Sequence, residues 1–491
     1  MKEAGVIVAA LLAAVAVLHR SPRPAAWATL GALVLTPVLL LAQIWDSSQL
    51  EPLRDRPTLF AALGAAALVA VAAAAWAMRR WPATLPVAAV VALPFRVPIS
   101  SGGTTSNLLV ALYLVIAAGA LGWALAELRR PDDGREEEIH PARRLEWALM
   151  GFVVLYAVQA LYSDDFGKAL SQIAFFYVPF ALLYARMRRV AWTPRLLAWC
   201  LGALCALAVV FVGVGFWEYH ARELLLNPKV INGNEFASYF RVNSLFFDPN
   251  IYGRFLAMVM IAVTAVLLWS PSTRLVLAGG VLLALLWAGL VLTFSQSSFV
   301  ALLAGLAVLG AIRWSRRWTA AVAAALVVAG AAIVVAAPGA LHLDLGSSAS
   351  ADRATSGRYD LVRGGAQLFA DRPAQGWGSA SFSRAYRREL DESTERAVSA
   401  SHTIPVTVAA EQGVPGFLAY VALVALALLT LLRRSSRSPA RAAVAAAFVA
   451  LLVHTMLYAA FLEDPLTWVL LGIGGALAGL PAPDGDEPAT A

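Results

Sequence analysis

Apolar runs long enough to cross a membrane repeat along nearly the whole chain. A spanning helix needs about 20 mainly apolar residues, and fifteen runs approach that length, at about 4–18, 25–45, 58–78, 82–99, 106–128, 145–163, 166–187, 195–217, 250–269, 274–293, 297–313, 318–337, 414–432, 441–460 and 465–480. The runs 4–18 and 82–99 are the weakest, because the first is short and prolines interrupt the second. The pattern predicts an all-α, polytopic membrane bundle of about 14 to 15 spans.

The polar connections between these runs alternate in charge. One set, which includes 129–144 and 433–441, is rich in arginine, whereas the other set contains the two longest polar stretches, 219–249 and 338–412. Lysine and arginine in short loops favour the cytoplasmic side of a membrane. The alternation therefore predicts that both long stretches face away from the cytoplasm. The N-terminus lies on that side too if all fifteen runs span the membrane.

The longer outward stretch, from Pro338 to Gln412, has a helical pattern of its own. Apolar residues at helical spacing predict helices over Arg358 to Asp371 and from Phe382 to Leu390, with a turn at Gly376-Trp377-Gly378 between them. The stretch is thus predicted to form a small helical cap on the outer membrane face. Function is expected there, because the spans are committed to satisfying their own backbone in lipid.

The same pattern divides the chain into five segments. They are N-terminal spans (1–218), spans that open with the first outward stretch (219–337), the outward helical loop (338–412), C-terminal spans (413–480) and an acidic, proline-rich tail expected to be disordered (481–491).

Composition supports a membrane protein and excludes other classes. The chain is 60% hydrophobic and 14% charged, with a mean hydropathy of +0.70, so a water-soluble domain of this size would lack the polar surface to cover it. The net charge of +7 does not indicate a nucleic-acid partner, because the arginines lie in short clusters between apolar runs. Cys200 and Cys205 share one apolar run and are too few for a disulfide framework or a metal site.

Four short motifs follow one another in the second half of the chain. They are Arg241-Val-Asn-Ser-Leu245 with Asp248-Pro-Asn250, then Ser356-Gly-Arg358, then Arg372-Pro-x-x-Gly376-x-Gly378, and finally His402 followed eleven residues later by Gly413-Val-Pro-Gly416. In this order and on the outward side, they resemble the O-antigen ligase and O-antigen polymerase family, over about Arg241 to Leu432. The chain departs from the family pattern at Thr403 and at Ser295-Gln-Ser297-Ser298.

This resemblance implies a membrane glycosyltransferase with a GT-C-like helical fold. Its donor is a glycan on undecaprenyl diphosphate, its acceptor is a sugar hydroxyl, and its site faces outward from the bacterial cytoplasmic membrane. The implied reaction is inverting and needs neither nucleotide sugar nor metal nor another cofactor. Ligation to a lipid-A core and polymerisation of surface polysaccharide repeats use the same chemistry, so the sequence leaves both open.

The chemistry of the leaving group assigns roles to residues in these motifs. The diphosphate gains negative charge as the sugar bond breaks, and a planar guanidinium pairs well with two phosphate oxygens. Arg241 and Arg358 are therefore predicted to hold the diphosphate, with Arg254 behind them. His402 is the predicted general base, because imidazole, with an ordinary pKa of about 6.5, accepts a hydroxyl proton near neutral pH. The predicted supporting residues are Glu411, Gly413, Gly416, Asp248 and Asn250.

Three other interpretations remain. Asp164 and Asp165 end an outward span and offer a metal site, helped by Asp46 or by Glu463-Asp464, although adjacent aspartates are more often a solvated helix terminus. A transporter or flippase of the same lipid-linked substrate is the alternative function, but that class places charges in the middle of spans, where this chain has few. A scaffold in a polysaccharide assembly complex is the third.

Overall fold

The computed structural model describes residues 2–45, 54–101, 104–132, 134, 136–138, 140–226, 240–317, 319, 358–389, 401, 403–458 and 460–480. Of Ile44, residues 97–101 and 104–108, Arg358 and Tyr359, only the backbone is described. Within these ranges the chain is helical throughout, apart from connections and one antiparallel hairpin, β1 (Val97–Ser101) with β2 (Thr104–Leu108). The predicted fold class, a polytopic helical membrane protein, is confirmed.

The helices run in two series. The first comprises α1 (Lys2–Leu18), α2 (Pro22–Ile44), α4 (Pro57–Arg80), α5 (Thr84–Ala92), α6 (Val110–Leu128), α7 (Arg143–Gln159), η1 (Ala160–Tyr162), α8 (Phe166–Gln172), the π-helical η2 (Ile173–Tyr177), α9 (Val178–Arg188) and α10 (Pro194–Ala221). The second comprises α12 (Pro249–Trp269), α13 (Thr273–Leu292), α14 (Gln296–Arg313), α17 (Arg358–Asp371), α18 (Phe382–Glu389), α19 (Ile404–Leu432), η3 (Ser435–Arg437), α20 (Pro439–Thr455) and α21 (Pro465–Gly479).

Local sequence explains where several of these helices begin. α10, α12, α20 and α21 each start with proline, which tolerates the first helical turn because its missing N–H has no partner there. The residue before each proline caps the helix by accepting a backbone N–H on its side chain. These caps are Thr193, Asp248, Ser438 and Asp464.

Ten helices of the described chain are long and apolar enough to cross a membrane, and they match ten of the fifteen predicted runs. The runs 4–18, 441–460 and 465–480 form shorter helices, of 17, 17 and 15 residues. The run 82–99 does not form a spanning helix: α5 has nine residues and the chain then enters the hairpin. Pro94 and Pro98 explain this, because proline lacks the N–H that a continuing helix needs. The run 318–337 lies outside the described residues, apart from position 319.

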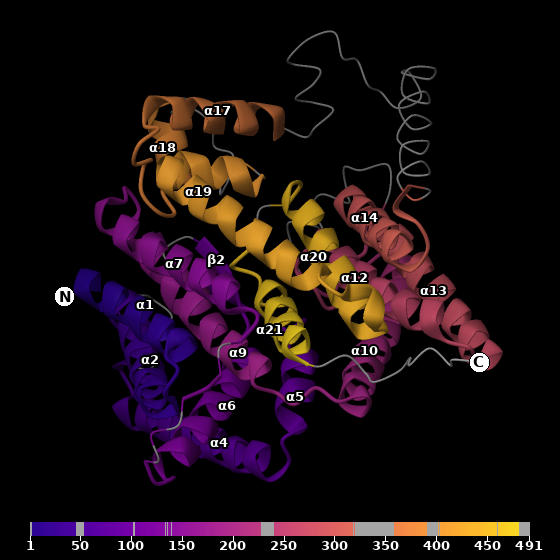
Figure 1. The fold of residues 1–491 in the computed structure, drawn as a ribbon. Helices are drawn as coiled ribbons and strands as arrows, with labels where there is room; N and C mark the ends of the chain where they lie inside the picture. Colours follow the sequence, from indigo (N-terminus) through magenta and orange to yellow (C-terminus); the bar gives the residue numbers. More distant parts are fainter. Residues whose placement is uncertain are drawn as a thin grey trace.

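The predicted outward cap packs on the first part of α19. Helix α17 coincides with the predicted 358–371 helix, and α18 covers the described part of the predicted second one. Figure 1 shows both lying across the N-terminal end of α19, away from the other helices of the bundle. They share a small core with that end, formed by Leu368, Trp377, Phe382, Ala385 and Ala410. The main core lies among the membrane helices.

Helix α7 runs from one predicted side of the membrane to the other. Its first end adjoins the arginine-rich stretch that includes Gly134, and its last residue, Gln159, donates to the Gln412 carbonyl beneath the cap. We expect a cysteine at Arg387, in α18, to react with a membrane-impermeant maleimide in spheroplasts, whereas one at Gly134 reacts only in inverted vesicles. A Cys200→Ser, Cys205→Ser background removes the native thiols. Labelling of both positions from one side would contradict the predicted orientation.

Candidate active site

Asp464, the cap of α21, is shared by two arginines. The Arg254 guanidinium on α12 donates a hydrogen bond to its Oδ2 atom, and Arg96 Nη2 lies 4.0 Å from the same oxygen. The Arg254 and Asp464 side chains are each 4% exposed, and that of Arg96 is 17% exposed. Arg254 Nη1 and Arg96 Nε are buried and have no hydrogen-bond partner within the described part of the chain. One carboxylate thus serves two guanidinium groups, which leaves donors buried and unused.

The Asp-Pro-Asn motif lies beside this pair at the start of α12. Asp248 Oδ1 caps the helix by accepting from the Asn250 N–H at 2.6 Å, and Tyr458 donates to Asp248 Oδ2 at 3.3 Å. Burial, with the Asp248 charge nearby, raises the pKa of Tyr458 well above its ordinary value. The phenol therefore remains a donor at neutral pH. Both Arg254 and Arg96 are near enough to Tyr458 to act on it electrostatically.

Arg241 joins the same group through Asn250. Its Nη2 atom lies 3.4 Å from Asn250 Oδ1, and its Nε donates to the Thr293 carbonyl at 3.0 Å. Asn250 and Arg254 are four residues apart on α12 and so lie on one face of that helix. Arg241, Arg254 and Arg96 come from three separate segments and meet around the start of α12. We call these three residues, with Asp248, Asn250, Tyr458 and Asp464, the arginine group.

Glu218 fixes the turn that carries Arg241. This fully buried carboxylate on α10 accepts the backbone N–H groups of Asn243, Ser244 and Leu225 at 3.1, 2.7 and 3.2 Å. Ser244 has a positive φ of 51°, which permits the sharp turn. Hydrogen bonds from backbone N–H groups compensate a buried carboxylate and define its position. Arg241 is therefore set by a rigid turn, although the outward stretch that precedes it is long.

The serine motif at the start of α14 supports the same region. Ser295 Oγ lies 2.9 Å from Asn250 Oδ1 and 2.7 Å from Ser298 Oγ, which in turn donates to the Asn250 carbonyl. Ser297 Oγ lies 3.3 Å from His454 Nε2 in the core. These hydroxyl groups stand where many members of the resembled family carry a Ser-Arg pair. Here they orient Asn250, and through it Arg241.

A second set of predicted residues lies at a kink in α19. Gly413 interrupts the helix with φ 63° and ψ −163°, a combination that is nearly exclusive to glycine. A Cβ atom there would lie 2.7 Å from the Pro373 carbonyl oxygen and 2.8 Å from the Gly376 nitrogen. Gly416 is also tight, since a Cβ would meet the Gln412 side chain. Both glycines lie where the backbone packs too closely for a side chain.

The turn before α18 fits against this kink. Gly376 and Gly378 have φ values of 68° and 91°, and a Cβ on either would lie 2.3 Å from backbone atoms of Glu411 or Ser163. Hydrogen bonds between backbones join the two segments: Trp377 to Ala410, Gly378 to Glu411 and Val414 to Pro373. We call this contact the glycine interlock. It accounts for the Arg-Pro-x-x-Gly-x-Gly motif as a packing requirement.

Glu411 holds the interlock from inside. Its buried carboxylate accepts the N–H groups of Ala380 and Phe382 at 2.9 and 3.1 Å, so it caps the start of α18. Trp377 is buried beneath Arg372, whose guanidinium lies 3.7 Å from the ring centroid. These contacts give Glu411 a positioning role for the cap.

Asp164 and Asp165 bind the cap through arginines. Arg388 lies 2.8 Å from Asp164 Oδ2, and Arg384 lies 3.2 Å from Asp165 Oδ2. Asp165 also caps α8 by accepting from the Lys168 N–H. Among the described residues, no three His, Cys, Asp or Glu side chains are grouped as a metal site would require. The observed partners of the two carboxylates are thus cations of the protein itself.

The connection between α20 and α21 links the two parts of the site. Tyr177 donates to Glu463, whose pKa is raised by burial, and Glu463 is adjacent to Asp464 of the arginine group. Thr403 Oγ1 donates to the Met456 carbonyl at 3.0 Å, close to Tyr458 in the chain. The segment that carries residue 402 therefore meets the connection that carries Tyr458. His402 itself and the side chain of Arg358 lie outside the described residues.

The structure thus brings together four predicted residues: Arg241, Asp248, Asn250 and Arg254. It gathers Glu411, Gly413 and Gly416 at the interlock instead. Sequence reasoning did not assign Arg96, Tyr458 or Glu218 to the site, and it placed Asp464 in the metal alternative. A signal was present for Arg96, an arginine between two prolines in a weak span on the predicted outward side.

Part of the chain matches a known protein family. Residues 281–421 match the model of the O-antigen ligase family. The match confirms the family resemblance predicted from the motifs and supports an O-antigen ligase- or polymerase-type function in a membrane. A search of curated proteins found no match.

The O-antigen ligase match covers α14, the cap and the first part of α19, including the whole glycine interlock. Arg96, the segment Arg241 to Arg254, and Asp464 lie outside it. The arginine group is thus formed entirely by parts of the chain that flank the O-antigen ligase region on both sides.

Replacing Gly413 tests the interlock. We expect Gly413→Ala to lower the free energy of unfolding by at least about 2 kcal/mol, because a Cβ is strained at this backbone conformation and meets two backbone atoms. Denaturant titration of the protein in detergent measures this. Gly280→Ala, in α13 with no atom within 4 Å of the added Cβ, is the matched control and should change little. Equal stability of both variants would refute the interlock.

Proposed function

We propose that this protein is an inverting glycosyltransferase that moves a glycan from undecaprenyl diphosphate to a sugar hydroxyl, without a metal ion. The site would face outward from the bacterial cytoplasmic membrane. The product is either a ligated lipid-A core or an extended surface polysaccharide. The O-antigen ligase match supports the class of reaction, and the arginine group supports the choice of donor.

The buried guanidinium donors of Arg254 and Arg96 carry this proposal. Both arginines share the Asp464 carboxylate, and Arg254 Nη1 and Arg96 Nε have no hydrogen-bond partner among the described residues. A buried donor without an acceptor is costly. A diphosphate offers several charged oxygens, which would satisfy these donors.

The proposed mechanism follows from the charge that develops. As the bond from the sugar to the diphosphate breaks, negative charge grows on the leaving oxygen, and guanidinium groups already in place stabilise it without rearranging. Asp464 and Asn250 position the arginines. His402 accepts the proton of the attacking hydroxyl, and the carried glycan is transferred with inversion because the attack comes from the face opposite the diphosphate. The contact of Thr403 with Met456 supports a place for this segment beside the arginine group.

The function is tested with purified protein, lipid-linked glycan and an acceptor glycan. We expect His402→Ala to reduce transfer by about 100-fold or more, the usual range for loss of a general base, and EDTA to leave transfer unchanged. Product is measured by gel mobility and mass spectrometry. Movement of the carrier across liposomes without a new glycosidic bond would favour the flippase alternative, and loss of activity in EDTA would favour the metal site.

Arg96 is tested separately, because it lies outside both the motifs and the family match. We expect Arg96→Gln to lower kcat/KM for the lipid-linked donor by about 10- to 100-fold, the effect of losing one charge-assisted contact. Arg56→Gln, an exposed arginine on the same predicted side, is the control. Unchanged kinetics in a folded Arg96→Gln protein would remove Arg96 from the donor site.

A further inference from the structure

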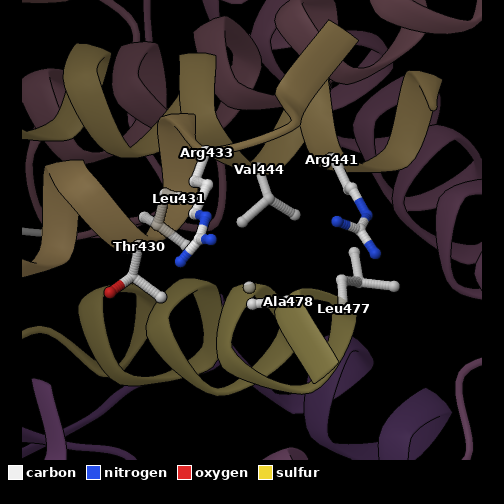
Figure 2. A pocket seen from close by; sticks show the side chains of 8 residues that line it. Thr430, Leu431, Arg433, Arg441, Val444, Leu477 and Ala478 are labelled. Atoms are coloured by element: carbon white, nitrogen blue, oxygen red, sulfur yellow. The ribbon is translucent and has the colours of Figure 1, made fainter. Parts of the chain in front are cut away.

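A hollow lined by two arginines lies at the end of the bundle far from the cap. It lies between the C-terminal end of α19, the start of α20 and the end of α21, and Arg433, Arg441, Leu431, Val444 and Leu477 line it. Figure 2 shows both guanidinium groups directed toward the hollow, with Val444 between them and Leu477 and Ala478 on the opposite wall. Gly413 and Leu432 are 19 residues apart on α19, so this end is about 30 Å from the glycine interlock.

Positive charge is concentrated here without a matching carboxylate. Arg433, Arg434, Arg437 and Arg441 are four arginines within nine positions, and Arg434 and Arg437 repel the Arg441 guanidinium. Within the described part of the chain, none of the four forms an ion pair with an acidic side chain. By contrast, Arg188 and Arg189 on the same predicted side pair with Glu137.

Helix ends do not supply enough negative charge to balance these groups. The C-terminal ends of α19 and α21 each contribute about half an elementary charge, and Arg441 Nη2 donates to the Leu480 carbonyl at 2.9 Å. The two helix ends together offset about one of the two positive charges in the hollow. The N-terminus of α20, capped by Ser438, adds positive potential. An anion between the two guanidinium groups would complete the balance.

The shape of the hollow indicates the kind of anion. The hollow is shallow and open: its empty space, about 210 Å³, includes the open mouth, and its interior does not enclose a small molecule. Its walls are apolar side chains below the guanidinium groups, at the ends of spanning helices. A phosphate group would therefore be held at the mouth by the two arginines, with the rest of a lipid outside, against the apolar helix surface.

We propose that Arg433 and Arg441 bind the phosphate of an anionic phospholipid of the cytoplasmic leaflet. Their short, arginine-rich loop is on the predicted cytoplasmic side, and the anionic lipids of that leaflet attract basic residues at the ends of spans. The guanidinium groups hold the phosphate, and Leu431, Val444 and Leu477 contact the glycerol and the upper acyl chain. The site is separate from the arginine group, so it stands whether or not the proposed transfer reaction is correct.

The test is lipid retention. Protein in nanodiscs of phosphatidylcholine with phosphatidylglycerol is extracted into detergent, and bound phosphatidylglycerol is counted by native mass spectrometry. We expect wild type to retain it, and Arg433→Gln with Arg441→Gln to retain at least tenfold less. Arg434→Gln with Arg437→Gln removes the same charge from the same loop outside the hollow, and should lose less than threefold. Ala478→Phe fills the hollow with both arginines present and should also lose retention.

Several results would overturn the proposal. Equal losses of phosphatidylglycerol in the two double variants would indicate a diffuse charged surface. Binding of inorganic phosphate to wild type that is as strong as binding of phosphatidylglycerol would indicate that the ligand is a soluble anion. Retention that appears only after removal of residues 481–491 would identify the acidic tail as the occupant. If the arginine variants fail to fold, Ala478→Phe decides: unchanged retention in that variant rejects the site.

Discussion

The carboxylate of Asp464 between Arg254 and Arg96 is the interaction on which the proposed site depends. It joins the start of α21, the first turns of α12 and the segment after α5, which are hundreds of residues apart in the chain. Removing one partner of a buried ion pair typically costs about 3–5 kcal/mol, because the other charge is left without compensation. One carboxylate cannot satisfy two guanidinium groups, and the remaining donors are those that Arg254 and Arg96 bury without a partner. The pairing with Asp464 holds both arginines in place before a substrate binds, and their unused donors remain available to an anion. Stabilising a departing diphosphate requires both properties.

The glycine interlock explains how a polar cap is held in place on a membrane bundle. Gly376, Gly378 and Gly413 let three backbone segments approach more closely than any side chain allows, while Glu411 accepts N–H groups at the start of α18. Arg384 and Arg388 add ion pairs to Asp164 and Asp165 at the edge of the cap. The O-antigen ligase match covers this interlock and contains no residue of the arginine group. The family pattern thus describes how the cap is positioned, and the flanking segments add positive charge beside it.

The sequence predicted correctly those features that depend on interactions between residues close together in the chain. Ten helices long and apolar enough to cross a membrane and the helix over 358–371 follow from hydrophobic periodicity and proline placement, which act over a few residues. The prediction of a weak span over 82–99 was wrong, because its prolines end α5 early. Arg96, Tyr458 and Glu218 escaped prediction because each has contacts with residues far away in the chain, such as Glu218 with Asn243, 25 positions away. The ion pairs of Asp164 and Asp165 could not be predicted from the sequence, because their arginine partners lie more than 200 positions further along the chain.

The most direct measurement is the structure of the protein bound to undecaprenyl diphosphate, determined by cryo-electron microscopy in a lipid nanodisc. The account predicts phosphate oxygens within hydrogen-bond distance, about 3 Å, of the Arg254 and Arg96 donors that are unpartnered here, with Asp464 still between the two guanidinium groups. It also predicts that the isoprenoid chain leaves the site between spanning helices near Arg241. Diphosphate bound instead at Asp164 and Asp165 through a divalent ion, or in the hollow at Arg433 and Arg441, would contradict the assignment of the donor site.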